Sequence, residues 1–160
     1  MFSERGSPDT GLIVRQGGAM AEVRIFSLEE AERTLPLVRR ILSDLQGEYD
    51  VWRHAMADYE LLAAGARADT GETPELVSAR NVVTVAADRV NELLLELEGI
   101  GCVFKGIDEG LVDFYALRDD RLVFLCWRLG EERISHWHEV DSGFAGRQEI
   151  DPSLFSEIVP

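Results

Sequence analysis

The sequence predicts an α+β fold in which a long antiparallel helical hairpin, coiled-coil-like, packs on a small antiparallel β-meander of three to four strands. Two changes of pattern predict it. Over residues 27–98, apolar residues recur at steps of three and four, which is the period of amphipathic helices. Over residues 102–140, the apolar residues alternate with a period of two, which is typical of strands. The chain of 160 residues is short enough for a single domain, which we place over residues 23–160.

The first helix is expected to begin after Ser27, because Ser27 and Glu30 have the spacing of a capping box. Its apolar stripe alternates steps of three and four, the pattern of a coiled-coil seam. The stripe consists of Leu28, Ala31, Leu35, Val38, Leu42, Leu45, Tyr49, Trp52, Met56 and Tyr59. We expect the helix to end near Ala64.

The second helix is expected to begin at Pro74, with Thr73 as its N-cap, and to end at the glycines Gly99 and Gly101. Its stripe consists of Leu76, Ala79, Val83, Ala86, Val90, Leu93, Leu97 and Ile100. Two matched stripes joined by a short loop predict the antiparallel hairpin. Further apolar residues fall outside the stripes and need the sheet or a partner chain to cover them: Leu37, Ile41, Val82, Val85, Leu94 and Leu95.

Four strands are predicted, over residues 102–105, 111–117, 122–129 and 134–140, followed by a C-terminal loop and tail over residues 141–160. If Asp119 and Asp120 form a two-residue turn, Asp113 lies opposite Cys126. One face of this strand pair is then entirely apolar and should pack on the hairpin. The other face carries Asp113, Cys126 and Arg128.

The last predicted strand decides which chemistry this second face has. Placing Trp137 on the apolar face puts His136 and His138 on the second face, and a three-residue turn would set His138 opposite Cys126. A slip by one residue would move both histidines to the apolar side. A Cys–His nucleophile pair is disfavoured, because Cys126 lies in the apolar run LVFLCW and a catalytic thiolate needs exposure.

Two interpretations of this cluster stay open. The first is a divalent metal site, for example for zinc, formed by His136, His138 and Asp113, with Glu139 or Asp141 as a further carboxylate. The second is a half-buried polar network without a metal.

The glycine-rich loop over residues 141–147 also allows two interpretations. Its backbone amides and Arg147 would suit an anion. The more common alternative is a tight turn in which Arg147 pairs with Asp141 or Glu139.

The charge excludes several classes of function. With 30 acidic and 16 basic residues the net charge is −14, which repels nucleic acid and anionic membrane surfaces.

No segment reaches the roughly 20 apolar residues of a membrane span, and the N-terminus lacks the pattern of a secretory signal. Residues 1–22 are expected to form a flexible arm, and Met20 offers an alternative start. Two cysteines make no disulfide framework, so we expect a cytoplasmic protein.

Two functional hypotheses follow. The first is an interaction or structural protein that forms a homodimer through its helical hairpin. The alternative is a small metal-binding protein or metal-dependent enzyme with its His/Asp cluster on an exposed sheet face.

Several segments of the chain are similar to a known family. FSLEEAERTLPLV, GLVDF, LCWRLGE and WHEVDSGFAGR resemble the prokaryotic family called domain of unknown function 2203, over roughly Ile25 to Ile150. The chain departs from the family at Tyr115, where proline is frequent. The family has no established activity, so the resemblance implies no catalytic residues.

Overall fold

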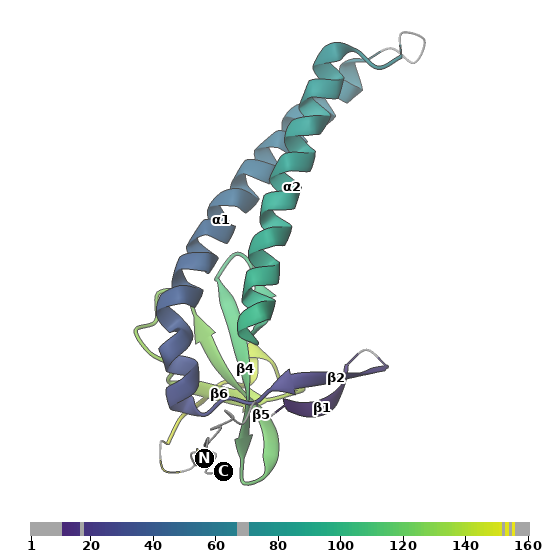
Figure 1. Ribbon diagram of the computed structural model, residues 1–160. Helices are drawn as coiled ribbons and strands as arrows, with labels where there is room; N and C mark the ends of the chain where they lie inside the picture. The colour runs from purple at the N-terminus through teal and green to yellow at the C-terminus, as the bar shows by residue number, and fades with distance from the viewer. Residues whose placement is uncertain (1–10, 17, 67–70, 152, 154, 156–160) are drawn as a thin grey trace, which may run out of the picture.

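The structure, a computed structural model, describes residues 11–16, 18–66, 71–151, 153 and 155. Its fold is α+β, with two helices packed on an antiparallel sheet (Figure 1). The helices α1 (Leu28–Gly65) and α2 (Pro74–Ile100) form the hairpin. The main sheet has five strands in sequential order: β3 (Val103–Gly106), β4 (Leu111–Arg118), β5 (Arg121–Arg128), β6 (His136–Glu139) and β7 (Gln148–Glu149).

The helix ends follow from local rules. The Ser27 hydroxyl accepts a hydrogen bond from the Glu30 amide at 3.1 Å, and the Glu30 carboxylate accepts one from the Ser27 amide at 3.0 Å, so the expected capping box is present. The Thr73 hydroxyl caps α2, which begins at Pro74. Gly101 ends α2 with a φ of 101°, a left-handed conformation that glycine adopts without strain.

Both predicted apolar stripes are buried or partly buried along their whole length. The first turns of α1, from Ala31 to Leu45, form the main core together with the end of α2 and the apolar face of β4 and β5. Beyond this core the hairpin rises away from the sheet, and its helices pack only on each other (Figure 1). Of the apolar residues outside the stripes, Ile41 is buried, Leu94 is partly buried and the other four are exposed.

The strand prediction was correct for the hairpin formed by β4 and β5, and it missed the last strand of the sheet. Asp119 and Asp120 form the two-residue turn with φ values of 48° and 60°, and Asp113 lies opposite Cys126 as expected. The sheet has five strands rather than three to four. The additional strand, β7, lies inside the predicted C-terminal loop and tail and pairs with β6. A strand of two residues has no alternation to detect, so the sequence pattern does not reveal it.

The flexible arm expected over residues 1–22 is replaced, from Gly11 onward, by a β-hairpin of β1 (Gly11–Gln16) and β2 (Ala19–Arg24). Residues 1–10 of the expected arm lie outside the described residues. The two short strands lie among glycines, and most of their described side chains are exposed, so the sequence carries no clear apolar alternation there. Val23 of β2 and Ile25, which follows it, pack on Tyr115 and Phe124, and this packing covers part of the second face of the main sheet.

Neither helix in the described part of the chain has the length and apolar character needed to cross a membrane.

Candidate functional site

Three side chains from three neighbouring strands meet on the second face of the main sheet. Asp113 comes from β4, Cys126 from β5 and His138 from β6, and one potential ligand atom from each lies within 4.8 Å of the others. The His138 Nε2 atom is 3.0 Å from the Asp113 Oδ2 atom. All three residues are buried. We refer to these three residues as the buried triad.

The register of β6 differs from the prediction by two residues. His136, and not His138, lies opposite Cys126, while His138 lies opposite Phe124. The connection from β5 to β6 runs from residue 129 to residue 135 instead of being a three-residue turn. Because a slip of two residues keeps every side chain on its face, Trp137 still lies on the apolar face and both histidines on the second face.

His136 does not join the triad. Its Nδ1 atom lies 2.9 Å from the hydroxyl of the adjacent Ser135, and the ring is only partly buried. The other residues proposed around the cluster are dispersed. Arg128 and Asp141 are exposed, and the Glu139 carboxylate pairs with Arg121 at 2.7 Å.

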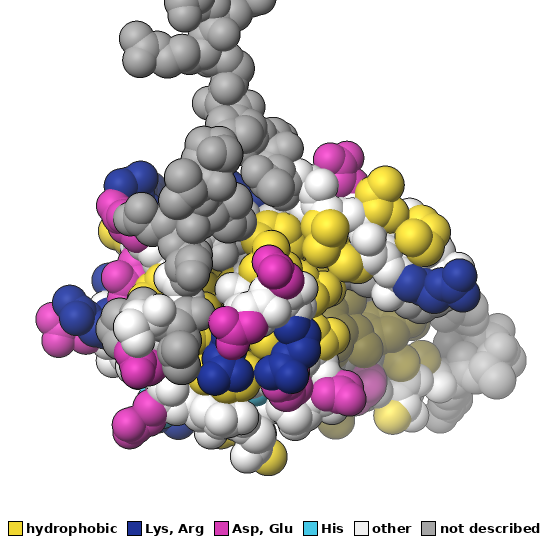
Figure 2. Space-filling model, turned by 90° about the horizontal axis from the view of Figure 1, so that it is seen from below, with side chains coloured by type: hydrophobic (Ala, Val, Ile, Leu, Met, Phe, Trp, Pro, Cys, Tyr) yellow, Lys and Arg dark blue, Asp and Glu magenta, His cyan; other side chains and the backbone are white. Residues whose placement is uncertain are grey.

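Sequence analysis placed the cluster on an exposed face of the sheet, and the structure shows that it is buried. Asp113 and His138 are each only 2% exposed. The ring of Phe124 lies between those of Tyr115 and His138, with centroids 4.5 Å and 5.4 Å away. In Figure 2, histidine barely reaches the surface at the sheet end of the molecule. Sequence alternation separates the two faces of a strand but does not reveal what covers the second one.

The hydrogen bonds fix the orientation of the His138 ring. Its Nδ1 atom lies 2.7 Å from the backbone carbonyl of Glu139. A carbonyl only accepts, so Nδ1 carries a hydrogen and Nε2 faces Asp113. The Cys126 thiol is hydrogen-bonded to the same Asp113 carboxyl.

Burial dominates the electrostatics of the triad. Burial raises the pKa of Asp113 above its ordinary value, although the neighbouring His138 opposes the shift. Burial, reinforced by Asp113, also raises the pKa of Cys126 to about 12. In the absence of a bound cation, the thiol is therefore protonated at neutral pH, which excludes the activated nucleophile.

Lys105 is a cation close to Asp113 that the sequence pattern did not place there. Its Nζ atom lies 3.9 Å from Asp113 Oδ2 and 4.8 Å from the centre of the Phe124 ring. The register between β3 and β4 shifts between Phe104 and Gly106, so Lys105 lies at an irregularity of strand pairing. The sequence pattern does not predict this irregularity.

Arg147 takes a partner that the sequence did not suggest. Its Nη2 atom lies 2.8 Å from both carboxylate oxygens of Glu131, instead of pairing with Asp141 or Glu139. In the loop before it, the amides of Gly146 and Arg147 bond to the carbonyls of Gly143 and Phe144. These two amides and the Nη2 atom of Arg147 are thus already engaged, and the Arg147 Nε atom is buried, which leaves little for the anion suggested by the sequence.

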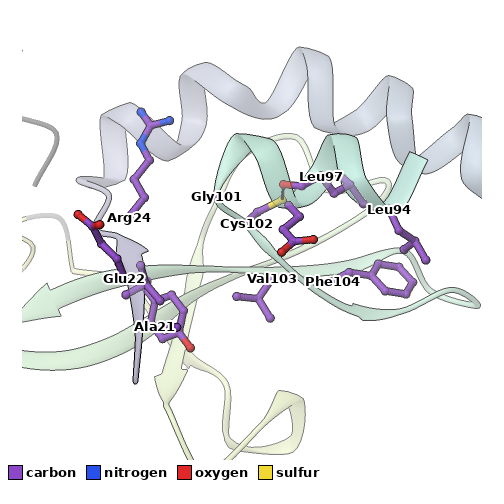
Figure 3. A pocket seen from close by; sticks show the side chains of 12 residues that line it. Ala21, Glu22, Arg24, Leu94, Leu97, Gly101, Cys102, Val103 and Phe104 are labelled. Carbon is purple, nitrogen blue, oxygen red and sulfur yellow. Dashed lines mark hydrogen bonds between the residues drawn. The ribbon is translucent and has the colours of Figure 1, made fainter. Parts of the chain in front are cut away.

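A separate cavity of about 430 Å³ lies between β2, the end of α2 and β3 (Figure 3). Its walls combine polar and apolar surface, with Glu22, Arg24 and Glu98 among the lining residues. The Cys102 thiol donates to the Leu97 carbonyl at 3.3 Å, and burial raises its pKa to about 11. This cavity therefore offers space but no activated group.

Comparison with known proteins agrees with the resemblance in the sequence. The family described as "Uncharacterized conserved protein (DUF2203)" matches residues 24–150. The chain belongs to the DUF2203 family. No curated protein and no solved structure matches it. In this DUF2203 protein the segments GLVDF, LCWRLGE and WHEVDSGFAGR, on which the resemblance rests, supply one triad residue each and both members of the Arg147–Glu131 pair.

Proposed function

We propose that this protein binds a divalent transition-metal ion, most simply zinc, through Asp113, Cys126 and His138. The observation that carries the proposal is the convergence of three different ligand atoms within 4.8 Å. Thiolate sulfur, imidazole nitrogen and carboxylate oxygen are the ligands that zinc uses in proteins. Three protein ligands also leave one coordination position open, as in catalytic zinc sites.

The surroundings of His138 support this set of ligands. Histidines that bind metals usually donate their other ring N–H to a carbonyl or carboxylate, which fixes the tautomer and the ring direction. The contact from His138 Nδ1 to the Glu139 carbonyl at 2.7 Å is of this kind. His136 lacks such a geometry, so the metal site differs from the one expected on sequence grounds by exchanging His136 for Cys126.

The charge balance supports a cation as well. An ionised carboxylate and an ionised thiolate are costly to bury, and this cost raises the pKa of both Asp113 and Cys126. A bound dication offsets the cost and deprotonates a coordinating thiol. Binding therefore releases protons, and the affinity should rise with pH.

Lys105 tunes the site in this proposal. Its ammonium group, 3.9 Å from Asp113 Oδ2, occupies a place where positive charge is favourable in the absence of metal. A bound dication would be repelled by it. Lys105→Met should accordingly bind the metal more tightly than the wild type does.

The test uses the untagged full chain, stripped of metal and titrated with Zn²⁺ or Co²⁺. We expect one equivalent bound, and with Co²⁺ a near-ultraviolet band from the cobalt–thiolate bond. Cys126→Ser should lose the band, and His138→Ala should lose most of the affinity. His136→Ala is the matched control, because it removes the neighbouring histidine of the same strand face and should bind like the wild type.

An absence of stoichiometric metal and of the thiolate band in the wild type would refute the proposal. Equal losses in His136→Ala and His138→Ala, with both variants folded, would also contradict it. The triad would then be a hydrogen-bonded network inside the sheet and nothing more.

A further inference from the structure

The outer half of the helical hairpin has a regular face that nothing in the described structure covers. On α2, residues advance along this face in steps of three and four: Glu75, Ser78, Val82, Val85 and Arg89. Val82 and Val85 are 52% and 63% exposed. We call this face, with the part of α1 beside it, the outer face.

The helix α1 contributes a second row with the same spacing. The row consists of Glu48, Val51, Ala55, Asp58 and Leu62. Two adjoining grooves, of about 520 and 360 Å³, are lined by residues of both rows and share Ser78 and Val82. The two rows therefore form one continuous surface. Seams of this spacing are the surfaces through which helices associate, and a hairpin that used only its internal stripe would not need one.

The α2 part of the outer face is complementary to itself once Ala79, which lines the first groove, is counted with the row. Counting from Val82, Glu75 lies seven residues before it and Arg89 seven residues after it. Ala79 lies three residues before Val82, and Val85 lies three residues after it. A two-fold axis through Val82 turns an antiparallel copy of α2 so that each of these residues meets its counterpart.

We infer that the outer face binds a second copy of this chain, antiparallel, with the two-fold axis at Val82. Val82 then packs on Val82 of the other copy, and Val85 packs on the small Ala79. Arg89 lies beside Glu75 at both ends of the contact. A parallel arrangement would set Glu75 against Glu75 and Arg89 against Arg89, so the charges select the antiparallel one.

Arg89 is available for this contact. Within its own chain it lies 3.8 Å from Glu48 and 3.4 Å from Glu92, in pairs that are largely exposed to solvent. Exposed pairs of this kind hold the side chain only weakly. Pairing with the opposite charge of a second copy also reduces the repulsion between two chains that each carry a net charge of −14.

The size of the face indicates a weak dimer. A contact along the fifteen residues from Glu75 to Arg89 is ~22 Å long, and two helices are ~20 Å wide, so each copy covers on the order of 400 Å². A stable interface of standard size covers about 800 Å² on each partner. We therefore expect a concentration-dependent dimer in the micromolar range or weaker.

Disulfide trapping of the full chain tests the position of the axis. Val82→Cys places a thiol next to its own symmetry mate, and mild oxidation should yield a covalent dimer. Thr84→Cys is the matched control, because Thr84 is exposed on the opposite side of α2 and should give none. The native thiols of Cys102 and Cys126 are buried and should not interfere.

Charge exchange tests the pairing independently. By sedimentation, Arg89→Glu should weaken self-association by about tenfold, and the double variant Arg89→Glu/Glu75→Arg should restore it. A wild type that stays monomeric at every concentration overturns the inference and leaves the face to another partner. Equal cross-linking through residues 82 and 84, or no rescue in the double variant, overturns the antiparallel arrangement.

Discussion

The ion pair between Arg147 and Glu131 should be among the most costly contacts to break in this protein. The two side chains are only 12% and 18% exposed, and the Arg147 Nη2 atom lies 2.8 Å from the Glu131 carboxylate. The same carboxylate accepts the Arg128 amide at 2.9 Å. Arg147→Met keeps the aliphatic bulk and leaves Glu131 charged without its main partner. Breaking a buried pair in this way costs about 3 to 5 kcal/mol.

The remaining exposure allows water to reach Glu131, so we expect the lower end, about 3 kcal/mol of unfolding free energy. For a chain of this length that loss corresponds to a decrease of roughly 6–12 °C in the melting temperature. Urea denaturation measures it, provided that the slope of the transition is unchanged. Arg121→Met is the control, because the Arg121–Glu139 pair is 58% and 33% exposed and should contribute less than about 1 kcal/mol.

A second substitution separates burial of a charge from loss of packing. Glu131→Gln keeps an oxygen for the Arg128 amide and removes the charge. In the double variant Arg147→Met/Glu131→Gln the loss should be clearly smaller than the sum of the two single losses. Additive losses, or an Arg147→Met variant no less stable than Arg121→Met, would show that the pair is solvated and would refute this reasoning.

Three further predictions concern the helix cap and the triad. Ser27→Ala removes the acceptor of the capping box and should cost about 1 kcal/mol in urea denaturation, whereas Ser27→Asp should retain most of it. Burial raises the pKa of Asp113, so the folded state holds its proton more tightly; this contribution to stability is present at low pH and is lost as the pH rises from the ordinary value of 3.8 through the raised one. Without metal, Asp113→Asn should therefore gain stability relative to the wild type across that window, and a parallel pH profile would contradict the assignment. With its pKa raised to about 12 and its side chain buried, Cys126 should react with iodoacetamide at neutral pH only on unfolding, as mass mapping of the modified thiols would show.

Features determined by neighbours in the chain were accessible from sequence. The cap at Ser27, the end of α2 at Gly101 and the turn at Asp119–Asp120 each depend on a few adjacent residues. The assignment of the two sheet faces was also accessible, because alternation is a local property. These rules predict that Asp113 and His138 lie on the same face, where the structure brings them together.

Features that depend on distant parts of the chain were not accessible. The register of β6 is set by the connection after β5, where the Trp127 indole N–H donates to the Glu131 carbonyl at 3.2 Å. The covering of the second face beside the triad depends on Val23 and Ile25, which pack on Tyr115 and Phe124 far along the chain. Neither contact leaves a periodic signal in the sequence. The pairing of Arg147 with Glu131 leaves no such signal either, and it could not be predicted for the same reason.

The two proposals concern parts of the fold that serve different purposes. The apolar face of the main sheet holds the base of the hairpin, and the second face holds the triad. The outer face of the hairpin lies beyond the region where the sheet supports the helices (Figure 1). Sites that share no contacts contribute to stability additively. Arg89→Glu should therefore leave metal binding unchanged, and His138→Ala should leave self-association unchanged. A coupling between the two would mean that the hairpin transmits a change at the sheet, and both sites would then belong to one mechanism.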